Sequence, residues 1–268
     1  MTNLPKEIDF AVDQAFYDSL GEDKEVFRQE IFQMFRFVDY LFRLYIIMHY
    51  VITKNAALDE QELQTLGMDN LSSKYLFDNY EKEMSIYKFI YAIMLNKIDE
   101  VKDALDTKAI DTEQDLQKTS LFRFVSEKWD AHNINCLHIA ASLGRKEICR
   151  LLIENGFDVS ELLILYGIKA YPIPLSINEC LLMNALFQWY KSGKKKMTKD
   201  ELQRLIDTII LASSKGPSIV DSEHLLNSGI RVQWYWTHIK DAIEDAELLK
   251  QLIPLNPNAM NEILNIGG

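Results

Sequence analysis

The sequence predicts an all-α fold, in which an N-terminal helical region (residues 1–83) is followed by a short α-solenoid of helical pairs (residues 84–268). The chain of 268 residues contains only ten glycines and six prolines, too few for the many tight turns of a β-sandwich or barrel. Its apolar residues recur at helical spacing, and two Ser/Thr-x-x-Glu boxes stand directly before apolar runs, where they mark helix starts.

The strongest helical pattern covers residues 23–54. Its apolar stripe runs at alternating steps of four and three through Ile31, Phe35, Val38, Phe42, Tyr45, His49 and Ile52. Arg36, Asp39 and Arg43 share the other side, where they can pair. Each would cost about 2.5–3.5 kcal/mol at the centre of a bilayer. We therefore expect a long buried helix with one wet edge and no membrane span.

The composition bears on partners and location. A net charge of −11 repels phosphate backbones, so we expect no nucleic-acid partner. The three cysteines, Cys136, Cys149 and Cys180, form no CxxC pair and indicate free thiols in a reducing compartment. The N-terminal residues lack the apolar stretch of a signal peptide. These features favour a cytoplasmic protein, or one secreted into a host cell by a non-classical route.

One basic run, Lys194-Lys195-Lys196, lies beside Lys191 and Lys199. We interpret it as a solvated loop, with an acidic partner or anionic lipid as the alternative. Attachment to a membrane surface through this loop or the long helix is a further possibility for function, although we expect no membrane partner.

From residue 84 onward the pattern changes to short helices joined by tight turns. Ser85 is predicted to cap a helix that ends at Asn96-Lys97, and a second helix follows from Asp99. Two such helices form a hairpin. Residues 106–129 are expected to be a less regular insertion.

The helices after residue 170 are marked mainly by their caps. Ser176-x-x-Glu179 precedes an apolar helix through Trp189, and Thr198-x-x-Glu201 opens a helix to about residue 213. Residues 239–261 are interpreted as another degenerate helical pair.

The clearest stretch of the chain is residues 130–159. Leu137, Ile139 and Ala140 belong to a short helix that Gly144 can end, because glycine adopts a positive φ without strain. A second helix carries its apolar side at Ile148, Leu151 and Leu152, and Gly156 ends it in turn.

This stretch resembles an ankyrin repeat, a unit of about 33 residues. The family pattern is matched by Asp130, Leu137, His138, Ala140, Ala141, Gly144, Glu147, Leu151, Leu152, Gly156, Asp158 and Val159. Asn135 and Cys136 stand where the family usually has threonine and proline, so an asparagine amide would replace the threonine hydroxyl. Asn133 replaces the turn glycine and tolerates the left-handed region. One repeat buries its apolar face only against neighbours, so degenerate repeats are expected around it.

The resemblance implies a surface that binds another protein, made of turn tips and first-helix positions. The matching positions here are Ala131, His132, Ile134, Ser142 and Leu143. Ile134 is apolar where the family exposes a residue, which favours a contact. Outside the repeat, Trp234 and Trp236 flank Tyr235, and aromatic residues of this kind serve either as packing or as interface anchors.

The sequence favours a binding protein over an enzyme. Cys136 and His138 resemble a nucleophile and base, but their place in the repeat makes them structural. The histidines and cysteines are scattered, so neither a metal site nor a cofactor is expected. The alternative is an enzyme whose active site lies in or beside the N-terminal helices, with the repeats selecting the substrate.

A divergent ankyrin segment among unique helices is similar to effectors that intracellular bacteria deliver into host cells. The resemblance therefore implies an adaptor, or an effector that acts on a host protein, and does not identify the partner.

Overall fold

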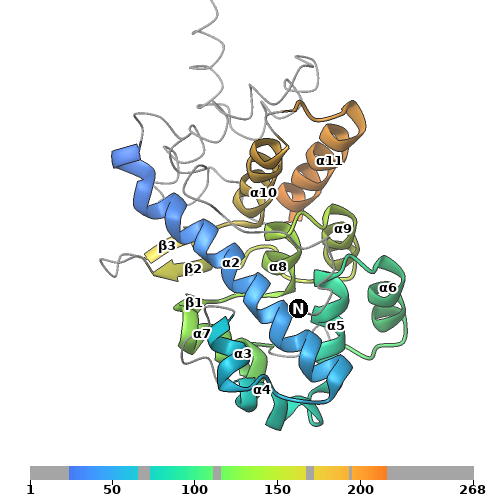
Figure 1. The fold of residues 1–268 in the computed structure, drawn as a ribbon. Helices are drawn as coiled ribbons and strands as arrows, with labels where there is room; N and C mark the ends of the chain where they lie inside the picture. The colour runs from blue at the N-terminus through green and yellow to red at the C-terminus, as the bar shows by residue number, and fades with distance from the viewer. Residues whose placement is uncertain (1–23, 66–72, 111–115, 167–171, 193–194, 216–268) are drawn as a thin grey trace, which may run out of the picture. The chain divides into compact units, whose positions relative to one another are not determined.

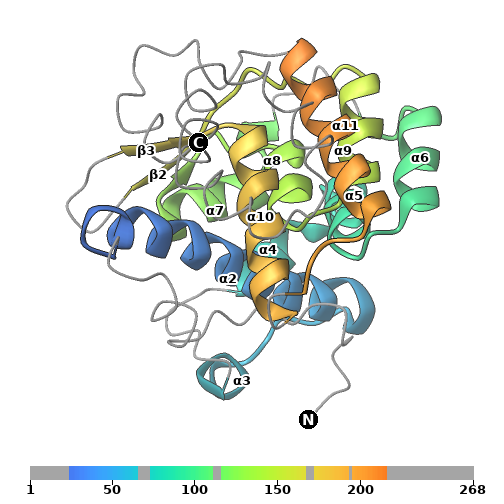
Figure 2. The ribbon, with the colours of Figure 1, turned by 90° about the horizontal axis from the view of Figure 1, so that it is seen from above.

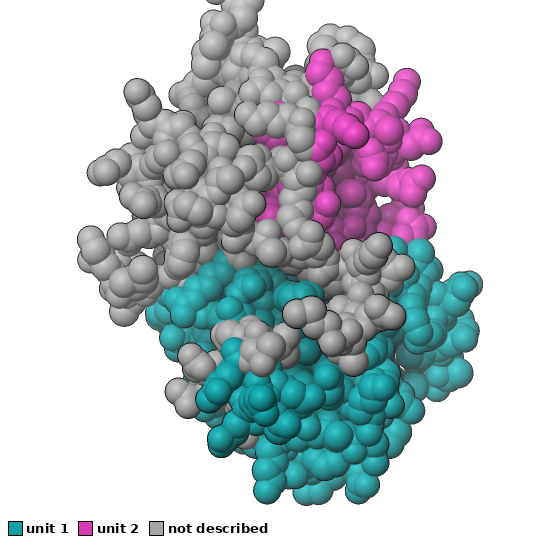
Figure 3. Space-filling view, in the orientation of Figure 1, with its two compact units in different colours: residues 1–139, 163–173 teal, residues 140–162, 174–268 magenta. Residues whose placement is uncertain are grey.

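The structure is a computed structural model that describes residues 24–65, 73–110, 116–166, 172–192 and 195–215. The chain divides into two compact units (Figure 3). The first comprises residues 1–139 and 163–173, and the second comprises residues 140–162 and 174–268. The boundary expected between residues 83 and 84 falls inside the first unit, and the boundary found at residue 139 falls inside a helix.

The predicted all-α class is confirmed, because the described residues are mostly helical (Figures 1 and 2). The helices of the first unit are α2 (Lys24–Lys54), α3 (Glu60–Thr65), α4 (Ser73–Tyr80), α5 (Met84–Met94), α6 (Ile98–Asp106) and α7 (Ser120–Trp129), with a 3-10 helix at Leu116–Lys118. Helix α8 (Cys136–Ser142) begins in this unit and ends in the second, which also contains α9 (Lys146–Glu154), α10 (Ile177–Lys191) and α11 (Lys199–Lys215).

Helix α2 is the long helix that the sequence predicts, and α4 and α5 pack against it. Two residues of the predicted stripe, Val38 and Tyr45, are at most 2% exposed, and a neighbouring set of apolar residues is buried with them. Phe37, Leu41, Leu44, Met48 and Val51 are all at most 1% exposed, whereas Phe42, His49 and Ile52 are half-buried. Both stripes are apolar, so periodicity alone could not choose between them. None of the described helices is long and apolar enough to cross a membrane.

A polar network joins α4, α5 and α7. Glu83, which precedes α5, accepts hydrogen bonds from the backbone N–H of Ser120 at 3.0 Å and from the Ser120 hydroxyl. The buried Tyr87 hydroxyl donates to the Leu76 carbonyl at 3.1 Å. The predicted cap at Ser85 is wrong, because α5 starts at Met84 and its N-cap residue is Glu83. Residues 106–129 also contain a regular helix, α7, whose N-cap is Thr119.

The hairpin predicted between residues 84 and 105 is confirmed as α5 and α6, which lie side by side (Figure 2). Asn96 adopts a φ of 57° between them, a conformation that asparagine tolerates better than most residues. The Lys97 N–H donates to the Ala92 carbonyl, which satisfies one of the last carbonyls of α5.

A small sheet that the sequence analysis did not predict lies beside the repeat. Its strands are β1 (Ala131–His132), β2 (Leu163–Tyr166) and β3 (Pro172–Leu175), in the order β1-β2-β3. Strands β1 and β2 are antiparallel, with Ala131 opposite Leu165 and His132 opposite Ile164. The Tyr166 N–H extends the ladder by donating to the Asp130 carbonyl at 3.2 Å. A run of Leu, Ile and Tyr at 162–166 was the available signal for β2.

In the second unit, α11 packs against both α9 and α10. The apolar sides of α9 and α11 are buried at Ile148, Cys149, Leu152, Leu205, Ile206 and Ile209. Both predicted capping boxes are confirmed. Glu179 accepts from the Ser176 N–H at 2.9 Å, and Glu201 accepts from the Thr198 N–H at 2.9 Å. Each serine or threonine hydroxyl in turn accepts from the glutamate N–H, at 3.3 Å in both boxes.

The turn between α8 and α9 is held by α10. Gly144 adopts a φ of 67°, and the Asn184 side chain of α10 donates to the Ser142 carbonyl at 3.0 Å. A Cβ atom on Gly144 would lie 2.1 Å from the Asn184 Oδ1. The turn therefore requires glycine for two reasons, its backbone conformation and its contact with the next helical pair.

Candidate functional site

Helix α8 starts with an N-cap at Asn135, where the ankyrin pattern has threonine. Asn135 Oδ1 accepts the backbone N–H of His138 at 3.0 Å, which is the bond of an N-cap residue. In the reverse direction, the Asn135 N–H lies 3.2 Å from His138 Nδ1. The two residues thus form a reciprocal box in which a histidine takes the place of the usual Glu or Gln. The prediction that an asparagine amide could serve here is confirmed, although its partner is the His138 backbone.

His138 also connects α8 to the sheet. Its side chain is fully buried, and the Leu163 N–H at the start of β2 lies 3.1 Å from its Nε2. A neutral imidazole accepts at one nitrogen, and an imidazolium accepts at neither. The ring is therefore a structural residue that faces two backbone donors and positions β2 beside the repeat.

Most of the predicted partner-binding positions are buried. Ala131, Ile134 and Ser142 have no exposed surface and Leu143 is 4% exposed. The expectation that Ile134 is exposed is wrong, because its side chain belongs to the core. Every residue of α8, from Cys136 to Ser142, is buried as well. A first helix in this state offers no side chain to a partner.

His132 is the predicted site residue that the structure places on the surface. It lies on β1 and is exposed, and its Nδ1 is 2.8 Å from the Ser126 hydroxyl of α7. The Tyr166 ring of β2 packs edge-to-face against it, with ring centroids 5.3 Å apart, and is itself 40% exposed. The neighbouring Asn133 is exposed and has a φ of 56°, which confirms its predicted left-handed turn.

We name this group the tip surface, comprising Ser126, His132, Asn133, Ile164 and Tyr166. All five residues belong to the first unit. Ile164 is half-buried and lies opposite His132 in the β1–β2 ladder. Tyr166 could not be predicted from the sequence, because its place beside His132 depends on a strand pairing over more than thirty positions of the chain.

A second aromatic group contains Trp129, which lies on α7 three residues after Ser126. Trp129 stacks on Tyr40 of α2 at a centroid distance of 5.0 Å, and the Arg36 guanidinium lies 5.1 Å from the centre of the Tyr40 ring. Residues three apart are neighbours on a helix surface. Helix α7 thus positions both groups, since it holds His132 through Ser126 and Tyr40 through Trp129.

The three thiols are not nucleophiles. Cys136, Cys149 and Cys180 are fully buried, and burial raises the pKa of each thiol, that of Cys180 to about 12. The thiolate is the reactive form, so at neutral pH these side chains act as core residues. The structural interpretation of Cys136 and His138 accords with their surroundings.

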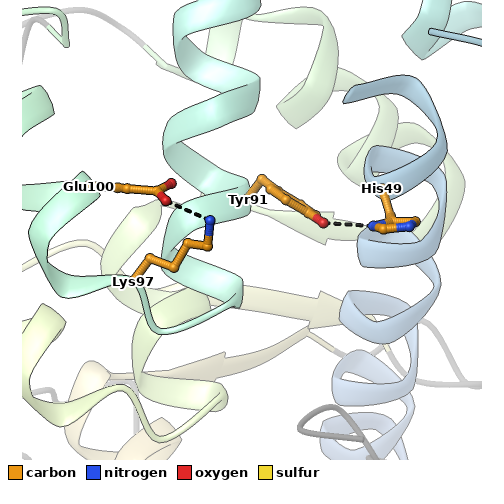
Figure 4. Close-up of polar contacts among 4 residues, drawn as sticks. All are labelled: His49, Tyr91, Lys97 and Glu100. Atoms are coloured by element: carbon orange, nitrogen blue, oxygen red, sulfur yellow. Dashed lines mark hydrogen bonds and ion pairs between the residues drawn. The ribbon is translucent and has the colours of Figure 1, made fainter. Parts of the chain in front are cut away.

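His49 of α2 and Tyr91 of α5 form the polar pair that stands where the enzyme alternative would place a site (Figure 4). His49 Nδ1 lies 2.7 Å from the Tyr91 hydroxyl. Burial lowers the pKa of His49, and the charge of Lys54 lowers it further. Burial also raises the pKa of Tyr91. The Tyr91 hydroxyl therefore keeps its proton at pH 7, and the imidazole tautomer decides which of the two groups donates.

The ion pair drawn beside it, Lys97 with Glu100 at 2.5 Å, is exposed (Figure 4) and contributes little to stability. Within the described ranges no group of three or more metal-ligating side chains is found. Trp234 and Trp236, the other predicted partner-binding residues, lie outside the described residues.

Comparison with known proteins finds a family model that matches part of the chain. Residues 132–161 match the family model of the ankyrin repeat. The match supports an ankyrin-repeat protein. It covers the α8–α9 pair and the turn that precedes it, which are the segments in which the sequence resemblance was found. No curated protein and no solved structure matches the chain. Ankyrin repeats typically bind other proteins, so the match also supports a protein–protein interaction module.

Proposed function

We propose that the protein binds another protein through the tip surface of its ankyrin repeat. The single observation that carries the proposal is the exposed pair of His132 and Tyr166, packed edge-to-face on neighbouring strands. Both rings are held in place, His132 by Ser126 and Tyr166 by the β1–β2 ladder. A rigid, amphipathic ring loses little conformational entropy on binding, which is why tyrosine is enriched at interface hot spots.

The burial of α8 supports the same location. Ankyrin repeats can offer both their tips and their first helices, but here the first helix is covered along its whole length. The tip residues His132 and Asn133 are exposed positions of the repeat before α8, as is Asp130. They stand beside Tyr166, which lies beyond the end of the family match.

The test is affinity capture with quantitative comparison of the bound proteins. We expect Tyr166→Ala and His132→Ala each to reduce recovery of the same partner, and the double variant to reduce it by about tenfold or more, which is the loss of one hot spot. Ile134 is unsuitable for such a test, because a polar residue there would disturb the core.

The matched control is Tyr75→Ala. Tyr75 is 37% exposed and also packs on one aromatic neighbour, Phe124, but it lies on α4. Circular dichroism should show all variants folded. A partner that is lost equally from the Tyr75 variant, or kept by the double variant, would contradict the proposal.

We further propose an adaptor or effector role in a reducing compartment, either the cytoplasm or the interior of a host cell. Three free and buried cysteines support the reducing compartment, and the likeness of the chain to delivered effectors supports the host cell. Expression of the tagged chain in host cells, followed by fractionation, tests the location. Recovery with membranes or in the medium would argue against it.

A further inference from the structure

The second unit carries a group of basic side chains where two helices begin. Lys146 is the first residue of α9, and Lys199 is the first residue of α11, the helix packed against α9. Lys195 and Lys196 are exposed in the segment just before α11, and Arg204 is exposed one turn into it. We call these five residues the basic end.

Among the described residues, the five cations of the basic end outnumber the three acidic residues that neighbour them in the chain, Glu147, Asp200 and Glu201. The Glu201 carboxylate belongs to the capping box, where it accepts hydrogen bonds from the N–H and the hydroxyl of Thr198 at 2.9 and 2.8 Å. Glu147 and Asp200 are exposed, and neither pairs with a cation in the part of the chain that the structure describes. Among the described residues, no carboxylate lies within 4 Å of the charged groups of Lys146, Lys195, Lys199 or Arg204.

Lys146 shows the electrostatic consequence most directly. Its side chain is half-buried, and burial is the main cause that lowers the pKa of its ammonium group. The charge of Glu201 offsets part of this effect, and the charge of Arg204 adds a smaller lowering. A cation that is partly removed from water gains free energy when a further anion approaches. The same anion would meet the exposed lysines of the preceding segment.

We propose that the basic end binds an acidic segment of a protein. The charge of the whole chain, −11, makes this local excess of cations stand out. A peptide segment contacts the basic end alone, and its carboxylates complement the lysines there. An anionic membrane, by contrast, presents a plane that also brings the acidic remainder of the chain within a Debye length of about 8 Å.

Two further observations favour a protein segment over a lipid or nucleic-acid surface. The large apolar side chains that are exposed among the described residues, Tyr75, Met84, Tyr166 and Ile210, include none at residues 195–204 that could enter a bilayer. The segment also presents no exposed aromatic ring on which a base could stack.

The experiment measures binding of a fluorescein-labelled peptide of ten glutamates to the full chain by fluorescence anisotropy. We expect binding at about 50 mM salt that weakens steeply as the salt rises. The charge reversal Lys195→Glu/Lys199→Glu should weaken it at least tenfold, and Lys146→Gln should weaken it less. A peptide of ten lysines should not bind.

The matched control is Lys88→Glu/Lys102→Glu, which makes the same change of net charge at exposed positions of α5 and α6. It should bind the glutamate peptide as the unaltered protein does. Equal weakening in this control would overturn the proposal, as would the absence of peptide binding. Binding to vesicles that contain phosphatidylserine, without binding to the peptide, would overturn it in favour of a membrane surface.

The basic end is independent of the tip surface. The double variant His132→Ala/Tyr166→Ala should bind the glutamate peptide normally, so the two proposals can fail separately.

Discussion

The family's threonine is replaced at residue 135, and the structure shows that the role of this position survives the replacement. Asn135 accepts the His138 N–H, and His138 in turn faces the Asn135 N–H. The motif Asn-Cys-Leu-His therefore starts a helix as a Ser or Thr box does. The sequence predicted that an amide could serve here. It could not show that the His138 ring also reaches β2, since that contact spans 25 residues.

Asn135→Ala removes this cap and leaves a buried donor without its acceptor. We expect the free energy of unfolding to fall by about 0.5–2 kcal/mol. Asn135→Thr, which restores the family's residue, should retain most of the stability. Urea unfolding followed by circular dichroism measures both. Equal losses in the two variants would show that side-chain capping is not the role of residue 135.

Two glycines with positive φ end the helices of the repeat, and their surroundings differ. A Cβ at Gly144 would overlap the Asn184 side chain, whereas a Cβ at Gly156 would meet nothing within 4 Å. Gly144→Ala should therefore lose about 2–4 kcal/mol of stability, from backbone strain and overlap together. Gly156→Ala should lose only the strain, about 1–2 kcal/mol. Chemical denaturation of both variants makes the comparison, and losses of the same size would contradict the contact with Asn184.

At the scale of elements, the helices that a capping box marks were predicted well, and α7 was missed. The boxes at Ser176 and Thr198 identified the starts of α10 and α11, because a cap and an apolar run are read over a few residues. Helix α7 was missed, although Thr119 caps it. Its entry depends on Glu83, 37 residues earlier in the chain, which satisfies the Ser120 N–H. The cap at Thr119 was the local signal for α7, and the contact with Glu83 lies outside the segment 106–129.

Both capping boxes contain a glutamate, but the two glutamates differ in burial. We therefore expect their substitution to lower the free energy of unfolding by different amounts. Glu179 is 1% exposed, whereas Glu201 is exposed. Glu179→Ala should lower the free energy of unfolding by about 1–3 kcal/mol, because the Ser176 N–H is left buried without an acceptor. Glu201→Ala should cost less than about 1 kcal/mol, because water replaces the carboxylate. Thermal unfolding tests the order, and a reversed order would refute the argument from burial.

For the whole molecule, the sequence predicted the class and the central repeat but not the sheet. Strand β2 is an apolar run of four residues. Such a run is too short for its hydrophobic periodicity to distinguish a strand from a buried helix. The partner-binding residues were only partly predicted. Family positions identified His132, while Ile134, Ser142 and Leu143 are buried by neighbours that a single repeat pattern cannot foresee.

The buried thiols predict a loss of stability at alkaline pH. Their pKa values are raised in the folded protein, whereas a cysteine in the unfolded chain has a pKa of about 8.5. The unfolded state thus releases protons first, so this stability is complete below about pH 8.5 and is lost as the pH rises above it. The burial-raised pKa of Tyr87 acts in the same direction at higher pH.

The urea concentration at the unfolding midpoint should therefore decrease when the pH is raised from 7.5 to 9.5. The decrease should be smaller in Cys149→Ala. The substitution itself lowers stability at both pH values by creating a cavity. The quantity to compare is therefore the change in midpoint between the two pH values, in the variant and in the unaltered protein. An undiminished difference would show that Cys149 does not contribute to the alkaline loss.

The complete burial of α8 limits how this repeat can acquire new ligands. A substitution in α8 alters core packing before it alters recognition, so a library built on that helix would yield mainly unfolded variants. The short turn at His132 and Asn133 and the outward positions of β2 are free of this constraint. Diversification, whether natural or engineered, should therefore accumulate in a few loop and strand positions while the helical pair behind them stays nearly unchanged.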